Sequence, residues 1–176
     1  RYDKPIAGSV VMVSREGTRP LLVEVQALVD TAQAQPRRMA LGLDYQRLSM
    51  LLAVMHRHGG IHTSGMDVYV NVVGGVKVME TGSDLAVLLA CASSIREKAL
   101  PNRLCVFGEL GLSGEIRPVP NGQERLKEAM KHGFTHAIVP RANAPAANHP
   151  QFKNIQIIAV DRLDEAIYQA FEINAG

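Results

Sequence analysis

Tryptophan is absent from this chain of 176 residues, and phenylalanine and tyrosine contribute only four residues each. Proteins that bind single-stranded nucleic acid without sequence preference usually stack the bases on aromatic side chains. So few aromatic residues argue against a stacking platform of that kind. Any contact with nucleic acid is therefore expected to be electrostatic and independent of base sequence.

Cysteine is also scarce, and Cys91 and Cys105 both lie inside apolar stretches. This placement predicts two reduced thiols in the core. No Cys/His spacing resembles a zinc site. His56 and His58 fall two positions apart near the end of an expected helix, which turns their rings to different sides of it. We therefore expect no metal site and no bound cofactor in this chain.

Neither excess charge nor long apolar runs stand out. The net charge of +2 permits contact with nucleic acid but does not indicate it. No apolar run approaches the roughly 20 residues needed to span a bilayer, and no signal peptide is visible. We therefore expect a soluble, cytoplasmic protein. Because the chain begins at Arg1 without a methionine, we also expect it to be a piece of a longer protein. Residues 1–7 are expected to form an arm, and residues 8–176 a single domain.

The sequence does contain alternating strand and helix patterns, which predict a mixed α/β layer fold. A hairpin is expected over 9–13 and 21–29, followed by a polar loop over 31–38. Further strands are expected over 67–73, 104–107, 115–119, 137–139 and 155–160. Helices are expected to begin at the caps Asp44, Asn121 and Asp161. The helix from about 84 to 98 is apolar without a break over 85–92, which predicts that it is central and buried.

Glycine-rich segments provide the more specific signals. The segment Gly74-Gly75-Val76-Lys77 lacks the spacing of a phosphate-binding loop and has no following Ser or Thr, so we expect no ATP hydrolysis by this chain. The motif Gly82-Ser83-Asp84 opens the buried helix, and a second motif comprises Gly108-Glu109, Gly114, Pro118 and Gly122-Gln123-Glu124. Together they resemble the proteolytic domain of the Lon family over roughly residues 8–171, which implies a Lon-like fold.

This resemblance places the family's catalytic serine at Asp84 and its catalytic lysine at Gln123. A Ser–Lys dyad works because a neutral amine accepts the hydroxyl proton and the alkoxide attacks a carbonyl. A carboxylate and an amide supply neither function, so we expect no catalytic residue at either position. One alternative is a displaced nucleophile at Ser83 that works with Lys77, although one residue turns the side chain by about 100° around a helix.

The segments 71–77 and 114–119, together with Asp84 and Gln123, resemble the Lon-like domain of a bacterial DNA repair family. That resemblance implies a hexameric ring that acts with single-stranded or branched DNA and with the RecA recombinase during branch migration. It also implies a RecA-like ATPase core and a zinc-binding segment. ATP, magnesium and zinc would therefore be bound in N-terminal regions outside this chain.

Basic side chains are the candidates for contact with DNA phosphates. Arg117 interrupts an apolar strand, and Lys127 and Lys131 lie one turn apart on one helix face, where Glu124 and Glu128 are spaced to pair with them. The DNA-contact candidates are Arg38, Arg47, Arg117, Arg125, Lys127 and Lys131. The leading hypothesis is a non-catalytic scaffold that contacts DNA. The alternatives are a Ser83 peptidase and an oligomerisation module without a DNA role.

Overall fold

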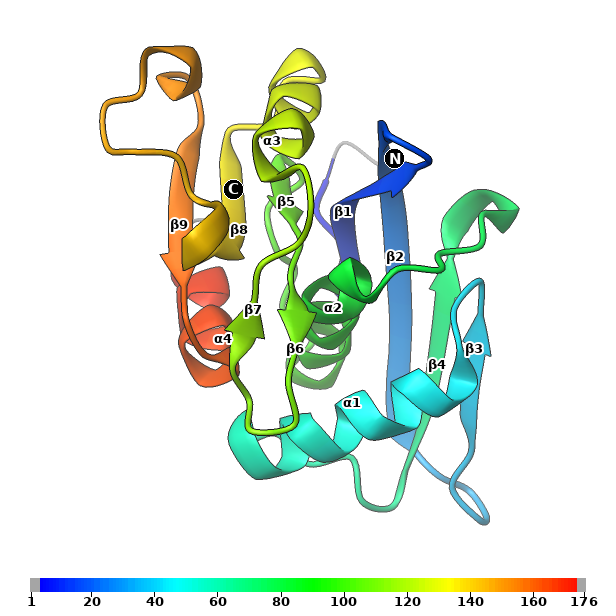
Figure 1. Ribbon diagram of the computed structural model, residues 1–176. Helices are drawn as coiled ribbons and strands as arrows, with labels where there is room; N and C mark the ends of the chain where they lie inside the picture. Colours follow the sequence, from blue (N-terminus) through cyan, green and yellow to red (C-terminus); the bar gives the residue numbers. More distant parts are fainter. Residues whose placement is uncertain (1–3, 174–176) are drawn as a thin grey trace.

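The computed structural model describes residues 4–173, and it is organised around a seven-stranded sheet in the order β3-β4-β2-β1-β5-β8-β9 (Figure 1). Residues 1–3 of the expected arm and 174–176 of the expected domain lie outside the described range. The strands are β1 (Ser9–Glu16), β2 (Arg19–Thr31), β3 (Arg38–Leu41), β4 (Met66–Val72), β5 (Leu104–Val106), β8 (His136–Pro140) and β9 (Gln156–Val160). A separate ribbon pairs β6 (Glu109–Leu110) with β7 (Ile116–Arg117).

The sheet is mostly parallel. Strands β1 and β2 form the predicted antiparallel hairpin, and β2 also pairs antiparallel with β4. The remaining neighbours, β3–β4, β1–β5, β5–β8 and β8–β9, are parallel. Parallel strands need crossover connections, which the helices provide. The predicted mixed α/β class is confirmed.

Helices cover the two faces of this sheet unequally. One face packs against α1 (Tyr45–His58), α2 (Asp84–Arg96) and α4 (Leu163–Glu172) and forms the larger core. The other face packs against α3 (Gly122–Lys131) and Phe152 in a smaller core that includes Val13, Phe107 and Val139. This second core lies over the half of the sheet that contains β1, β5 and β8.

Helix α2 occupies the central position that its unbroken apolar run predicts. Every residue from Asp84 to Ser93 is buried, and the helix packs against β1, β2 and α1. Both cysteines are buried, as expected, and burial raises the pKa of each thiol to about 12. The thiols are therefore protonated at neutral pH. Within residues 4–173, no helix is long and apolar enough to cross a membrane.

Some local predictions were wrong. The expected loop over 31–38 is shorter, because β2 continues to Thr31 and β3 begins at Arg38. The four-residue strand β3 was missed because its short alternating pattern gives little periodic signal. Asp44 caps α1 by accepting a hydrogen bond from the N–H of Gln46. Asp161 does not cap α4, whose N-cap is Arg162, and Asn121 precedes α3 with a left-handed backbone and no side-chain cap bond.

Candidate functional site

Asp84 lies in the first turn of α2, where the Lon resemblance places a nucleophile, and its side chain is fully buried. Arg47 reaches it from α1 with two hydrogen bonds: Nε donates to Oδ1 at 3.0 Å, and Nη2 donates to Oδ2. The backbone N–H of Leu110 in β6 also donates to Oδ2, at 2.9 Å. Both carboxylate oxygens are thus bonded within the fold, where they join α1, α2 and β6.

The electrostatics of this pair follow from its burial. Desolvation raises the pKa of the Asp84 carboxyl, while the hydrogen bonds from Arg47 and from the N–H of Leu110 act in the opposite direction. The hydrogen bond to Asp84 is the main cause that raises the pKa of Arg47. Removal of either member of this pair would leave an uncompensated charge at the junction of α1, α2 and β6, so the contact between Arg47 and Asp84 supports the fold.

The other polar residues of the expected dyad positions lie in different surroundings. Ser83 is buried, and its hydroxyl donates to the carbonyl oxygen of Glu80 at 3.0 Å. Lys77 is exposed on the segment that follows β4, and Gln123 is exposed in the first turn of α3. A small cavity of about 160 Å³ lies beside Arg47, Ser83 and Asp84.

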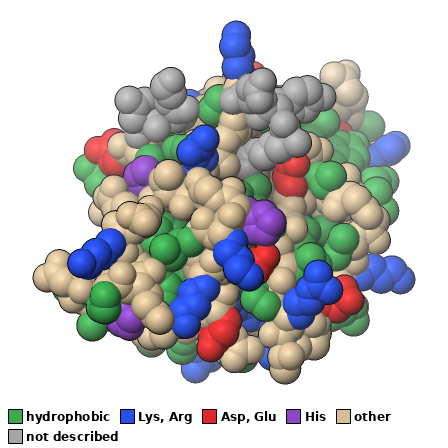
Figure 2. Space-filling view, turned by 90° about the horizontal axis from the view of Figure 1, so that it is seen from above, with side chains coloured by type: hydrophobic (Ala, Val, Ile, Leu, Met, Phe, Trp, Pro, Cys, Tyr) green, Lys and Arg blue, Asp and Glu red, His purple; other side chains and the backbone are tan. Residues whose placement is uncertain are grey.

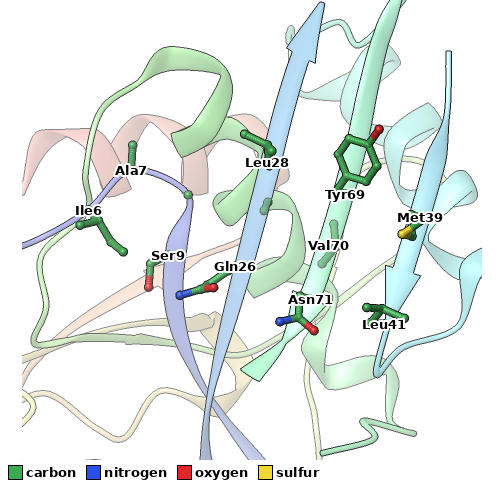
Figure 3. Close-up of a pocket in the computed structure, with 12 residues that line it drawn as sticks. Ile6, Ala7, Ser9, Gln26, Leu28, Met39, Leu41, Tyr69, Val70 and Asn71 are labelled. Atoms are coloured by element: carbon green, nitrogen blue, oxygen red, sulfur yellow. The ribbon is translucent and has the colours of Figure 1, made fainter. Parts of the chain in front are cut away.

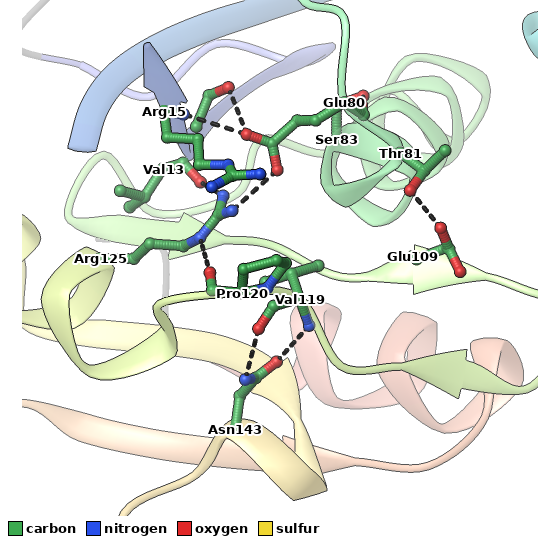
Figure 4. Close-up of polar contacts among 11 residues, drawn as sticks. Val13, Arg15, Glu80, Thr81, Ser83, Glu109, Val119, Pro120, Arg125 and Asn143 are labelled. Atoms are coloured by element: carbon green, nitrogen blue, oxygen red, sulfur yellow. Dashed lines mark hydrogen bonds and ion pairs between the residues drawn. The ribbon is translucent and has the colours of Figure 1, made fainter. Parts of the chain in front are cut away.

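Arg125 forms a second internal network, drawn in Figure 4. Its side chain is only 1% exposed, and it donates to the carbonyl oxygens of Pro120 at 2.9 Å and Val13 at 2.8 Å. Its Nη2 lies 2.9 Å from Oε1 of Glu80. The other oxygen of Glu80 accepts hydrogen bonds from the Ser14 hydroxyl and the Arg15 N–H, both at 3.0 Å. The network links α3, β1 and the turn before α2.

This burial corrects one sequence-based candidate. The guanidinium of Arg125 is enclosed and bonded, which leaves it no surface to offer a phosphate. Arg47 is likewise bonded to Asp84. Arg38 donates to the carbonyl oxygens of Met66 and Thr63 and to the Thr63 hydroxyl, so its guanidinium holds the segment before β4 in place. The guanidinium groups of these three arginines therefore all make contacts within the fold.

The other three candidates lie on the surface. Arg117 is exposed in β7, and Lys127 is exposed on α3. Lys131 is 75% exposed and lies 3.9 Å from Glu128, a carboxylate that also lies 3.0 Å from His132. Figure 2 shows the end of the molecule that is uppermost in Figure 1, where lysine and arginine side chains are scattered with acidic side chains among them. The cationic surface on this face is therefore discontinuous.

Two residues that organise this region were missed from the sequence. Glu80 anchors Arg125, and Asn143 brackets Val119 by accepting from its N–H at 2.8 Å and donating to its carbonyl at 2.9 Å. Both contacts join segments far apart in the chain, and no local pattern signals them. No group of three or more His, Cys, Asp or Glu side chains suited to a metal ion occurs within residues 4–173.

Comparison with known proteins gives the family. The model described as subunit ChlI of Mg-chelatase matches residues 51–143, just over half of the chain. The chain belongs to this family. DNA repair protein RadA of Pseudomonas aeruginosa is 61% identical over 173 residues, which is 98% of this chain and 38% of that protein. The RadA proteins of Escherichia coli and Bacillus subtilis are 60% and 44% identical over 95% and 92% of this chain.

These relatives confirm the recognition made from the sequence: close homologues of the chain are named DNA repair protein RadA. The chain spans little more than a third of the length of the RadA proteins that it matches. The homology therefore describes one part of a larger polypeptide.

Proposed function

We propose that this chain is a non-catalytic scaffold and DNA-contact domain within a larger protein that repairs DNA in the cytoplasm. The observation that carries the proposal is the Asp84–Arg47 pair. Both carboxylate oxygens of Asp84 are hydrogen-bonded to groups of the fold, at the position that the Lon resemblance assigns to a serine. In this proposal, the position holds an ion pair that stabilises the junction of α1, α2 and β6, and it takes no part in peptide cleavage.

The DNA contact is assigned to exposed cations. Arg117 and Lys127 are exposed, and the side chain of Lys131 is 75% exposed beside Glu128, so all three can be reached from solvent. Such contacts are electrostatic and sequence-independent, since phosphate oxygens are the same at every base. Support for DNA as the partner comes from homologues whose name is DNA repair protein RadA.

The larger protein, in this proposal, is a DNA-dependent ATPase that promotes branch migration of recombination intermediates. It works as a hexameric ring on single-stranded or branched DNA and alongside the RecA recombinase. ATP, magnesium and zinc are bound by the part of the polypeptide that relatives carry beyond this chain. That part is substantial, because this chain covers 38% of the Pseudomonas aeruginosa relative.

Two assays separate this proposal from its alternatives. In a peptidase assay with unfolded protein substrates, the wild-type chain and the Ser83→Ala variant should both be inactive. Activity that Ser83→Ala abolishes would establish the peptidase alternative. In a binding assay with single-stranded and branched DNA, the chain should bind more weakly as salt rises. No binding at low salt would leave a pure oligomerisation module.

A further inference from the structure

Side chains that bind metal ions are unevenly placed on the surface. The hollow of about 300 Å³ beside β2, β3 and β4 (Figure 3) is lined, among the described residues, by no histidine, cysteine, aspartate or glutamate. At the end of α1, in contrast, His56 and His62 are both exposed, and their Nδ1 atoms lie 2.8 Å apart. The ring centroids are 4.3 Å apart and the ring planes are inclined at 63°, so the rings do not stack face to face. One Nδ1 carries a proton and donates it in a hydrogen bond to the other.

The chain reversal after α1 creates this pair. In the sequence, His56 is nearest to His58, but these two rings leave the helix in different directions. Helix α1 ends at His58, and Gly59 and Gly60 then turn the chain back, with Gly60 in the left-handed region at a φ of 69°. The turn brings His62 beside His56, six positions away. Sequence spacing alone does not signal this contact.

The backbone at both histidines is held by buried neighbours. Met55, which precedes His56, is fully buried in the larger core. Thr63, which follows His62, is buried, and Arg38 donates to its carbonyl oxygen and to its hydroxyl, both at 3.3 Å. The two rings are therefore presented to solvent from fixed positions. Groups that are held in place before a ligand binds lose little conformational entropy when it arrives.

The spacing of the two nitrogens matches a particular metal geometry. Two ligands about 2.1 Å from one ion, on adjacent corners of a square plane or octahedron, lie about 3.0 Å apart, whereas a tetrahedral ion spreads them to about 3.4 Å. The 2.8 Å between the Nδ1 atoms is nearer the first value. Copper(II) and nickel(II) favour square-planar or tetragonal sites with imidazole ligands. Within residues 4–173 no third His, Cys, Asp or Glu joins the pair, so the site lacks the four protein ligands of structural zinc, and water would fill the remaining positions.

We propose that His56 and His62 together bind one divalent copper or nickel ion through their Nδ1 atoms. The proton between the rings moves, through solvent, to the outer Nε2 of its own ring, which frees both Nδ1 lone pairs for the ion. His56 lies in the last turn of α1, where the helix dipole favours a cation. The bound ion links α1 to the segment before β4 and so stabilises the folded chain. The site uses none of the residues assigned to DNA contact, and it stands independently of the proposed function.

The test is a titration of nickel chloride into the wild type and three single variants, followed by isothermal titration calorimetry at about pH 7.5, where imidazole is mostly neutral. The wild type should bind one ion per chain. Loss of a group that merely supports a metal ligand weakens binding by about 10- to 100-fold, so His56→Ala and His62→Ala, which each remove a ligand, should weaken it by about 100-fold or more. The matched control His58→Ala keeps both proposed ligands and should bind nickel as the wild type does.

Three results would overturn the proposal: no saturable binding by the wild type at millimolar nickel, wild-type affinity in His62→Ala, or a loss in His58→Ala as large as that in His62→Ala. Circular dichroism establishes that each variant is folded. A second readout locates the ion, because paramagnetic copper(II) at a low molar ratio should broaden the ring NMR signals of His56 and His62 before those of the other histidines. Broadening centred on another histidine, such as His132 beside Glu128, would mean an adventitious surface ion only.

Discussion

Two basic side chains of helix α3 differ in burial, since one is buried and the other is exposed. Arg125 is 1% exposed and bonded to two carbonyl oxygens and a carboxylate, whereas Lys131, less than two turns further along, is 75% exposed. Both are basic residues in one amphipathic helix, and the sequence offered both as DNA contacts. The difference shows that the position of a cation relative to the core decides whether it holds the fold together or meets a partner.

The same division runs through the whole molecule. Arg47 and Arg125 each join elements that are distant in the chain, while Arg117 and Lys127 project from the surface. Removing an interior cation should therefore lower stability, and removing a surface cation should lower only DNA affinity.

The largest loss of stability is expected for Arg125→Ala. The change leaves Glu80 without its cation and leaves two carbonyl oxygens unbonded, which should cost about 3 kcal/mol of unfolding free energy. Urea denaturation followed by circular dichroism measures it. Arg125→Lys keeps the charge, but a single ammonium group cannot replace the three nitrogens that contact Pro120, Val13 and Glu80, so it should fall between the wild type and Arg125→Ala. A loss below about 0.5 kcal/mol in Arg125→Ala, the usual range for surface substitutions, would place this arginine with the surface cations.

A somewhat smaller loss, about 2 kcal/mol, is expected for Asp84→Asn. The amide keeps the shape of the carboxylate but removes the charge that offsets Arg47. Arg47 is partly exposed, and solvent therefore limits the effect. In a double-mutant cycle with Arg47→Met, the two changes should cost less together than the sum of the single changes. Strict additivity would mean that the two side chains are not energetically coupled.

The smallest stability effect is expected for Lys131→Ala. The 3.9 Å pair with Glu128 is exposed on the lysine side, and such pairs contribute about 0.5 kcal/mol or less. The midpoint of thermal unfolding of the variant should be close to that of the wild type at both low and high salt. A loss of unfolding free energy as large as that of Arg125→Ala would mean that Lys131 also holds the fold together, which would contradict the contrast between the two residues.

Periodicity predicted the strongly patterned elements. The hairpin, the central helix α2 and the strands β8 and β9 each carry a run long enough to identify them, although β9 lies at the edge of the sheet and only Val160 of it is buried. Strand β3 has only four residues and was assigned partly to a loop. Asp161 was expected to cap α4, but its backbone N–H donates to Glu165, and the helix begins two residues later, at Leu163. Which of two neighbouring polar residues caps a helix depends on tertiary contacts, and these cannot be read from the sequence.

The site was less predictable than the fold. The resemblance assigns Asp84 and Gln123 to the dyad positions from the sequence alone. The contact that Asp84 makes could not be predicted, because its partner Arg47 lies 37 positions away. Glu80 gave no signal, since its partner Arg125 is further away still. Long-range ion pairs of this kind decide which basic residues remain free for a partner, and only the folded structure identifies them.

The dependence of DNA binding on salt tests the central claim most directly. The slope of log affinity against log salt counts the cations that neutralise phosphates. Replacing Arg117, Lys127 and Lys131 together with alanine should reduce that slope by about one unit for each true contact, and unfolding of the variant should remain near that of the wild type. A folded triple variant with the wild-type slope and affinity would contradict the account, as would a wild-type chain that fails to bind DNA at low salt.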